Sequence, residues 1–245
     1  MRARPTMIPT VTAAQMREVD RVVTEELHID LLQMMENAGR ALAERSRRFL
    51  GGDARGRRIV VLAGRGGNGG GGLAAARRLS IWGAQVTVVL AQRRDEMKGV
   101  PEQQLAILER MGVDARAGDA AIAGAELLLD ALVGYSLRGA PRGRIAELVG
   151  AANASRVPIV ALDLPSGLDP DSGRPREPTI RAASTLTLAL PKAGLMAPDA
   201  RGWVGDLYLA DVSVPELVYR RLGIAVGPIF AEGDIVPVDV RATVP

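Results

Sequence analysis

Residues 58–63 read Arg-Ile-Val-Val-Leu-Ala, and residues 64–72 read Gly-Arg-Gly-Gly-Asn-Gly-Gly-Gly-Gly. The first run is short and apolar, which is typical of a strand buried on both faces of a parallel sheet. The second run is a glycine-rich turn, and the alanine- and leucine-rich stretch 73–81 predicts a helix after it. Glycines let a backbone turn tightly and approach a ligand, and a helix N-terminus favours a phosphate. The stretch therefore predicts an α/β domain that binds a phosphate or a nucleotide.

The same alternation extends along the chain on both sides of this stretch. Upstream we predict two helices, one capped at Thr12 and one that starts near Asp30 and ends at Gly51 and Gly52. Downstream we predict strands at 85–91, 113–115, 126–132, 157–162, 185–190 and 206–212, with helices at 101–111 and 145–154. Strands that alternate with helices indicate a parallel sheet with helices on both faces.

The 245 residues suit a single domain without an internal repeat or a linker. We expect a loose arm at 1–10, which holds two prolines, a core at 11–215 and a C-terminal tail at 216–245. No apolar run approaches the roughly 20 residues of a spanning helix, and no secretory segment is visible. We therefore expect a cytoplasmic protein that does not bind membranes.

Composition excludes several classes of site. Without cysteine the chain has no disulfide, thiolate nucleophile or Cys-ligated metal, and a single histidine, His28, disfavours a multi-His metal site or a His-based triad. Aromatic residues make up 3% of the chain, which argues against a stacking platform for single-stranded nucleic acid. The net charge of +3 comes from scattered arginines, so we expect a solvated surface and no nucleic-acid partner.

Candidate chemistry follows the predicted strands, because ligands of parallel sheets bind beyond the carboxyl ends of the strands. Asp130 lies at such an end, where an aspartate is costly to bury unless it is paired, hydrogen-bonded or bound to a cation. Asp163 ends the next strand, and Ser166 follows in a Pro-Ser-Gly turn that can aim an oxygen at an ion. Lys192, one of only two lysines, lies in the loop 190–195.

Other interpretations of these residues stay open. Asp130 would equally suit hydrogen bonds to loop amides, and Lys192 would equally suit a solvated loop. A dehydrogenase is disfavoured, because residues 91–94 read Ala-Gln-Arg-Arg where an acidic ribose ligand is usual, although a ligand with an extra phosphate would fit there.

Taken in order, these segments resemble the NAD(P)H-hydrate epimerase family, the YjeF N-terminal domain. The matching segments are 34–39, 64–77, 130–139, 163–173 and 185–194. The resemblance covers roughly residues 11–215. It implies a Rossmann-like three-layer α/β/α sandwich with a mostly parallel sheet, often a homodimer. The implied activity is an isomerase that interconverts the R and S forms of hydrated NADH or NADPH, a repair reaction. The ATP- or ADP-dependent dehydratase of the same pathway would be a separate partner.

The resemblance also assigns residues by position. A potassium ion would contact Asn68, Asp130 and Ser166. The substrate would contact Gly67, Asn68, Gly69, Gly70, Gly71, Gly134, Tyr135, Ser136, Leu137, Arg138, Gly139, Ala140 and Asp163. Epimerisation needs an acid/base near the hydroxyl that the hydrate carries beside its ring nitrogen. We predict Asp163 in this catalytic role, with Lys192 to orient or protonate.

Three positions of the glycine-rich loop depart from the family pattern, and at one of them Arg65 replaces a proline. Gly67 and Gly71 stand where the family has asparagine and aspartate, so the loop lacks a carboxylate. This departure leaves an alternative open: a catalytically impaired nucleotide-binding or scaffold module on the same fold.

Overall fold

The computed structural model describes residues 8–116 and 120–239, so residues 1–7 of the predicted arm and 240–245 of the predicted tail lie outside it. Its strands are β1 (Arg58–Ala63), β2 (Gln85–Leu90), β3 (Asp114–Arg116), β4 (Leu127–Ala131), β5 (Ile159–Leu162), β6 (Ser184–Leu188), β7 (Asp206–Ala210) and β8 (Ile235–Pro237). Its helices are α1 (Ala13–Arg21), α2 (Leu31–Phe49), α3 (Gly67–Ile81), α4 (Gly99–Arg110), α5 (Gly143–Ser155), α6 (Arg201–Val204) and α7 (Glu216–Arg221). Short helical turns are η1 (Val22–Glu26), η2 (Arg94–Glu96), η3 (Ala120–Ile122), η4 (Ala193–Met196) and η5 (Pro198–Ala200).

The described strands form one sheet in the order β3-β2-β1-β4-β5-β6-β7-β8. Neighbours from β3 through to β7 pair in parallel, and only β8 runs antiparallel, against β7. The predicted strands are thus confirmed, with ends that shift by one or two residues. The predicted starts of both helices are also present: Thr12 forms a capping box with Gln15 at the start of α1, and the amide of Asp30 donates to the Gln33 side chain at 2.8 Å at the start of α2.

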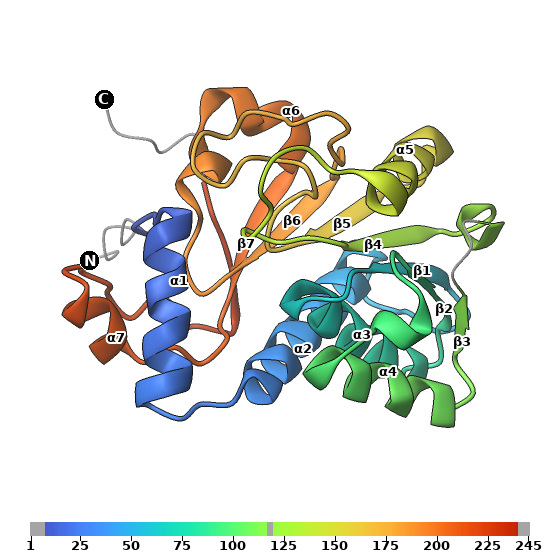
Figure 1. The fold of residues 1–245 in the computed structure, drawn as a ribbon, viewed down its shortest axis with the longest axis horizontal. Coiled ribbons are helices and arrows are strands. Elements are labelled where there is room, and N and C mark those ends of the chain that lie inside the picture. The colour runs from blue at the N-terminus through green and yellow to red at the C-terminus, as the bar shows by residue number, and fades with distance from the viewer. Residues whose placement is uncertain (1–7, 117–119, 240–245) are drawn as a thin grey trace.

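The sheet lies between two helical layers (Figure 1), and alternate residues of its strands pack against one layer or the other. Ile59 and Val61 pack with α2, α3 and α4 on one face, whereas Val60 and Leu62 pack with α5 on the other. This alternation is the period of two that a strand imposes on its side chains. It confirms the predicted three-layer α/β/α arrangement.

The start of α3 differs from the expectation of a glycine turn followed by a helix from residue 73. The helix begins at Gly67, and the amide of Gly70 already donates to the carbonyl of Gly66 at 3.0 Å. Glycine is a poor helix former, so its low propensity predicted a turn. Packing overrides this preference, because Gly69, Gly70, Gly71 and Gly72 are all buried under neighbouring elements.

Two elements lie within the predicted tail and were not foreseen. Helix α7 packs through Val218 and Tyr219 on α1. Strand β8 pairs Ile235 with Ala210 and ends at Pro237, a residue that suits an edge strand because it cannot donate a ladder hydrogen bond.

The strand order reverses between β1 and β4, since β2 and β3 lie on one side of β1 and β5 to β7 on the other. In open α/β sheets the ligand crevice forms at this reversal, beyond the carboxyl ends of the strands. The loops after β1, β4 and β5 therefore meet at the place where a ligand is expected. No described helix is long and apolar enough to cross a bilayer.

Candidate active site

The glycines after β1 bring the loop and α3 close to the end of β4. A Cβ atom at Gly64 would lie 1.9 Å from the carbonyl oxygen of Leu132, and one at Gly69 would lie 1.7 Å from the carbonyl oxygen of Gly64. Both distances are far below van der Waals contact, so only glycine fits. This close approach places Asn68, in the first turn of α3, beside the loop that follows β4.

The end of β4 carries a buried carboxylate held by the β5 loop. Asp130 accepts hydrogen bonds from the amide of Ser166 at 2.8 Å and from its hydroxyl at 2.7 Å. The amide of Leu132 donates to it at 3.2 Å. No described residue forms an ion pair with Asp130, and burial raises the pKa of this carboxyl to about 6. Asp130 is thus a buried carboxylate that accepts hydrogen bonds from two amides and one hydroxyl but has no ion-pair partner among the described residues.

The end of β5 carries a second carboxylate, and this one is paired. Asp163 has a left-handed backbone (φ 68°), and its amide donates to the carbonyl of Leu186 at 2.8 Å. One carboxylate oxygen accepts from the amide of Tyr135 at 3.1 Å, and the other forms an ion pair with Lys192. The side chains of Asp163 and Lys192 are 5% and 1% exposed, so the pair is almost fully buried.

Lys192 is held by several elements at once. Its ammonium also donates to the carbonyl of Leu188 at 2.9 Å and lies 5.7 Å from the centre of the Tyr135 ring. Its loop is clamped by Val11, whose amide donates to Pro191 and whose carbonyl accepts from Ala193, both at 2.9 Å. Lys192 is therefore a buried, fixed cation, and the interpretation as a solvated loop residue is wrong.

Asn68 and Asp163 face each other across Gly134. A Cβ atom at Gly134 would lie 2.8 Å from a carboxylate oxygen of Asp163 and 3.5 Å from the carboxamide oxygen of Asn68. The amide nitrogen of the Asn68 side chain is buried and has no hydrogen-bond partner within the described chain. Since Val133 donates its amide to the Ser166 hydroxyl at 3.0 Å, the loop 132–135 joins this pair to the Asp130 cluster.

Asn68, Asp163 and Lys192 border a cavity of about 750 Å³. One part of its wall is apolar and comes from α1, α2 and β6. Another part presents the exposed residues Arg65 and Arg138 together with the first turn of α3. The volume and this division suit a nucleotide-sized ligand with an apolar and an anionic part.

The sequence matches the family model described as YjeF-related protein N-terminus over residues 31–194. An NAD(P)H-hydrate epimerase of Dehalogenimonas lykanthroporepellens is 45% identical over 89% of this chain and 87% of that protein. The chain belongs to this family. An NAD(P)H-hydrate epimerase of Rhodopirellula baltica is 33% identical over 89% of each chain.

Two further similar proteins differ more from this chain, one in length and one in sequence. The chain matches 41% of the bifunctional NAD(P)H-hydrate repair enzyme Nnr of Moorella thermoacetica, with 37% identity over 84% of this chain. The crystal structure of yeast ynu0 (YNL200c) superposes with a TM-score of 0.82 over 94% of this chain and 100% of the yeast chain. At 23% identity, that likeness shows the fold, which agrees with the Rossmann-like arrangement expected of the family.

The residues that the family pattern singles out fall into three groups. Those that line the cavity are Gly67, Asn68, Gly134, Tyr135, Ser136, Leu137, Arg138, Asp163 and Lys192. Asp130 and Ser166 are fully buried and lie behind the lining. Gly69, Gly70 and Gly71 are buried in α3, and Gly139 and Ala140 are not among the lining residues.

Asp20 of α1 lines the cavity and was missed from the sequence. It accepts a short hydrogen bond from the hydroxyl of Tyr135. Burial raises the pKa of Asp20, and the hydrogen bond from Tyr135 lowers it by less. A signal was available, because Asp20 lies one helical turn after Met16 and next to Val19, on the apolar face of the helix.

Proposed function

We propose that this chain is an NAD(P)H-hydrate epimerase, an isomerase that interconverts the R and S forms of hydrated NADH or NADPH. Two relatives that bear this name share 45% and 33% of their residues with it over nearly nine-tenths of the chain. The observation that carries the proposal is the buried Asp163–Lys192 ion pair, which lines a nucleotide-sized cavity. This cavity lies where the strand order of the sheet reverses.

The pair suits the chemistry of the hydrate. The hydrate carries a hydroxyl on the ring carbon next to nitrogen, and the nitrogen lone pair can expel this group and leave a planar carbon. Expulsion needs a proton at the leaving oxygen, and addition of water on the opposite face needs a base. We assign the first transfer to Asp163 together with Lys192, because their bond places a donor and an acceptor at one point of the cavity.

We assign substrate binding to the residues that the family pattern selects. The first turn of α3, Gly67 and Asn68, would receive the pyrophosphate at a helix N-terminus. The loop 134–138 would cover the other side, with the guanidinium of Arg138 available to a phosphate. The buried Gly69, Gly70 and Gly71 would act through their backbone and through the shape that they give to α3.

We assign a potassium site to Asp130, Ser166 and Asn68, and the described residues fit such an ion. Alkali ions prefer oxygen ligands, and this cluster offers carboxylate, hydroxyl, carboxamide and main-chain oxygens. The unpaired, buried carboxylate of Asp130 is the feature that a cation would relieve. When bound, the ion would offset negative charge between the carboxylates and the substrate phosphates.

We further propose that the chain forms a homodimer, that it is cytoplasmic, and that a separate dehydratase acts on the same hydrates.

The test is an exchange assay on each epimer of hydrated NADH and of hydrated NADPH, with and without potassium. We expect the chain to accelerate exchange and Asp163→Asn to abolish it. Asp199→Asn, an exposed aspartate outside the cavity, is the matched control and should behave as the wild type. Binding of NADP without any acceleration of exchange would reject the epimerase and favour the impaired binding module.

A further inference from the structure

The cavity holds a second proton-carrying pair that the proposed chemistry has not used. The phenol of Tyr135 donates to the carboxylate of Asp20, and both residues line the cavity. Asp20 lies on α1 and Tyr135 lies in the loop after β4, 115 residues later in the chain. No described cation forms an ion pair with Asp20, so its carboxylate differs in character from that of Asp163.

Tyr135 also connects this pair to the first one. Its amide donates to Asp163 at 3.1 Å, and its ring centre lies 5.7 Å from the ammonium of Lys192. The cavity therefore brings two acid/base pairs, Asp163–Lys192 and Asp20–Tyr135, to one region. Two such groups suit inversion at the hydrated carbon, because one can protonate the leaving hydroxyl on one face while the other takes a proton from the water that adds to the opposite face.

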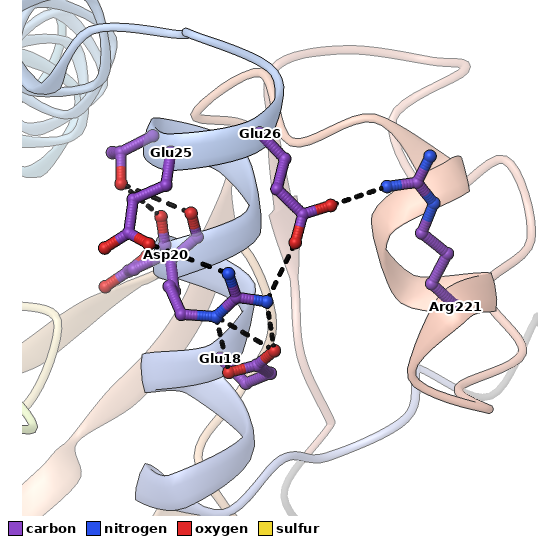
Figure 2. A network of polar contacts seen from close by, with 7 residues as sticks. Glu18, Asp20, Glu25, Glu26 and Arg221 are labelled. Carbon is purple, nitrogen blue, oxygen red and sulfur yellow. Dashed lines mark hydrogen bonds and ion pairs between the residues drawn. The ribbon is translucent and has the colours of Figure 1, made fainter.

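The fold holds Asp20 in place on its far side. The main-chain carbonyl of Asp20 accepts from the Thr24 hydroxyl at 2.8 Å, and the π-helical turn η1 starts two residues after it (Figure 2). The next residue, Arg21, binds Glu18 and Glu26, and Glu26 binds Arg221 of α7 at 3.0 Å (Figure 2). Helix α1 is thus fixed to α7 by ion pairs while Asp20 reaches the cavity.

We propose that Asp20 and Tyr135 form the second proton-transfer pair of the epimerisation. This inference rests on the proposed function. In the first half, Asp163 gives a proton to the hydroxyl as the Lys192 ammonium passes a proton to Asp163. The carbon–oxygen bond breaks, water leaves, and the nitrogen lone pair forms a carbon–nitrogen double bond. In the second half, a water adds to the other face and the double-bond electrons return to nitrogen. A proton of the added water passes to the Tyr135 oxygen as the Tyr135 proton passes to Asp20. One water leaves and one enters, so the first pair has lost one proton and the second pair has gained one. Between turnovers, solvent returns a proton to the first pair and takes one from the second.

The groups around the pair set its pH response. Tyr135, Lys192 and Asp163 face Asp20 within the cavity, Arg17 of α1 acts on the Tyr135 hydroxyl, and Tyr219 of α7 is the further titratable neighbour. Burial outweighs these contacts and raises the pKa of Asp20. In the direction of the reaction that needs an ionised Asp20, activity should therefore fall as the solution is acidified, at a pH above the ordinary pKa range of an aspartate.

The experiment compares Asp20→Asn and Tyr135→Phe with two matched controls in the exchange assay. The controls are Asp199→Asn, the exposed aspartate outside the cavity, and Tyr208→Phe, a half-buried tyrosine of β7 outside the cavity. We expect each cavity variant to lower kcat by about a hundredfold. Their affinity for unhydrated NADPH should stay unchanged, and Asp20→Asn should lose the acid limb of the pH profile. The controls should behave as the wild type.

The outcomes distinguish failure of the second proton-transfer pair from failure of the proposed function. If the wild type exchanges epimers and Asp163→Asn does not, while Tyr135→Phe keeps full kcat, the second pair is overturned and the proposed function stands. The same holds if the variants lose only affinity, or if Asp20→Asn leaves the pH profile unchanged. If Asp20→Asn fails to fold, Tyr135→Phe decides the matter alone. A wild type without exchange activity overturns the proposed function and this inference with it.

Discussion

The buried Asp163–Lys192 pair should be strongly coupled in stability as well as in activity. Removing one partner of a buried ion pair costs about 3–5 kcal/mol, because the other charge stays buried and uncompensated. Both side chains are almost fully buried, so solvent screening does not reduce this cost. In Asp163→Asn the ammonium keeps the Leu188 carbonyl and the Thr187 hydroxyl, which places its cost near the lower end. In Lys192→Met the carboxylate keeps only the Tyr135 amide, which places its cost near the upper end.

The double variant decides whether this reasoning is right. With both charges gone, no uncompensated charge remains, so we expect Asp163→Asn with Lys192→Met to be more stable than Lys192→Met alone. The free energies of unfolding come from urea titrations of the four proteins, and Lys98→Met, an exposed lysine, is the matched control. Single-variant costs below about 1 kcal/mol, or costs that add in the double variant, would refute a tightly coupled pair. All three variants of the pair should be inactive.

Two further predictions follow from the same loops. Potassium should stabilise the chain more at about pH 7 than at about pH 5. The pKa of Asp130 is raised to about 6 in the folded state, so the ion-free protein loses up to about 3 kcal/mol of folding stability as the pH rises from about 4 through 6. Bound potassium would offset this loss, because it binds the ionised carboxylate. Thermal unfolding in potassium chloride and in tetramethylammonium chloride measures this, and an equal potassium effect at both pH values would contradict it. Gly69→Ala should destabilise the chain by several kcal/mol, since its Cβ would strike the Gly64 carbonyl, whereas Gly67→Ala, with only Met35 at 3.9 Å, should be neutral or slightly stabilising. Equal unfolding free energies for the two alanine variants would show that the close approach at residue 69 is not needed.

The parts of the fold that were predictable are those with strong local patterns. The run 58–63 has the same bounds in the structure as in the prediction, because a strand buried on both faces is apolar along its buried length, here residues 59–63 after the exposed Arg58. Capping residues such as Thr12 and Asp30 act within one helical turn, so they too can be read locally.

The parts that were not predictable depend on contacts between distant segments. The helical start of α3 at Gly67 is imposed by neighbours such as Met35 and Ala131, which local propensity does not describe. Strand β8 has three residues and no long periodic pattern, and it exists because β7 offers a free edge. The same limit applies to the site: Asp163 and Lys192 were each found through motifs, but their ion pair spans 29 residues. Asp20 was missed because its partner, Tyr135, lies 115 residues away.

The missing family aspartate at position 71 acquires a specific meaning from this geometry. A Cβ atom at Gly71 would lie 3.0 Å from Leu162 and 3.5 Å from Ala38, and both of these residues line the cavity. An aspartate at position 71 would therefore start its side chain beside the apolar residues of the wall, and glycine leaves that space open. The change to glycine leaves intact the ion pair of Asp163 with Lys192, which the loops after β5 and β6 hold, and the Asp130 cluster after β4. Since the proposed proton transfers use groups from those loops and from α1, the loss at position 71 changes the shape and charge of the cavity without removing a group that the chemistry needs.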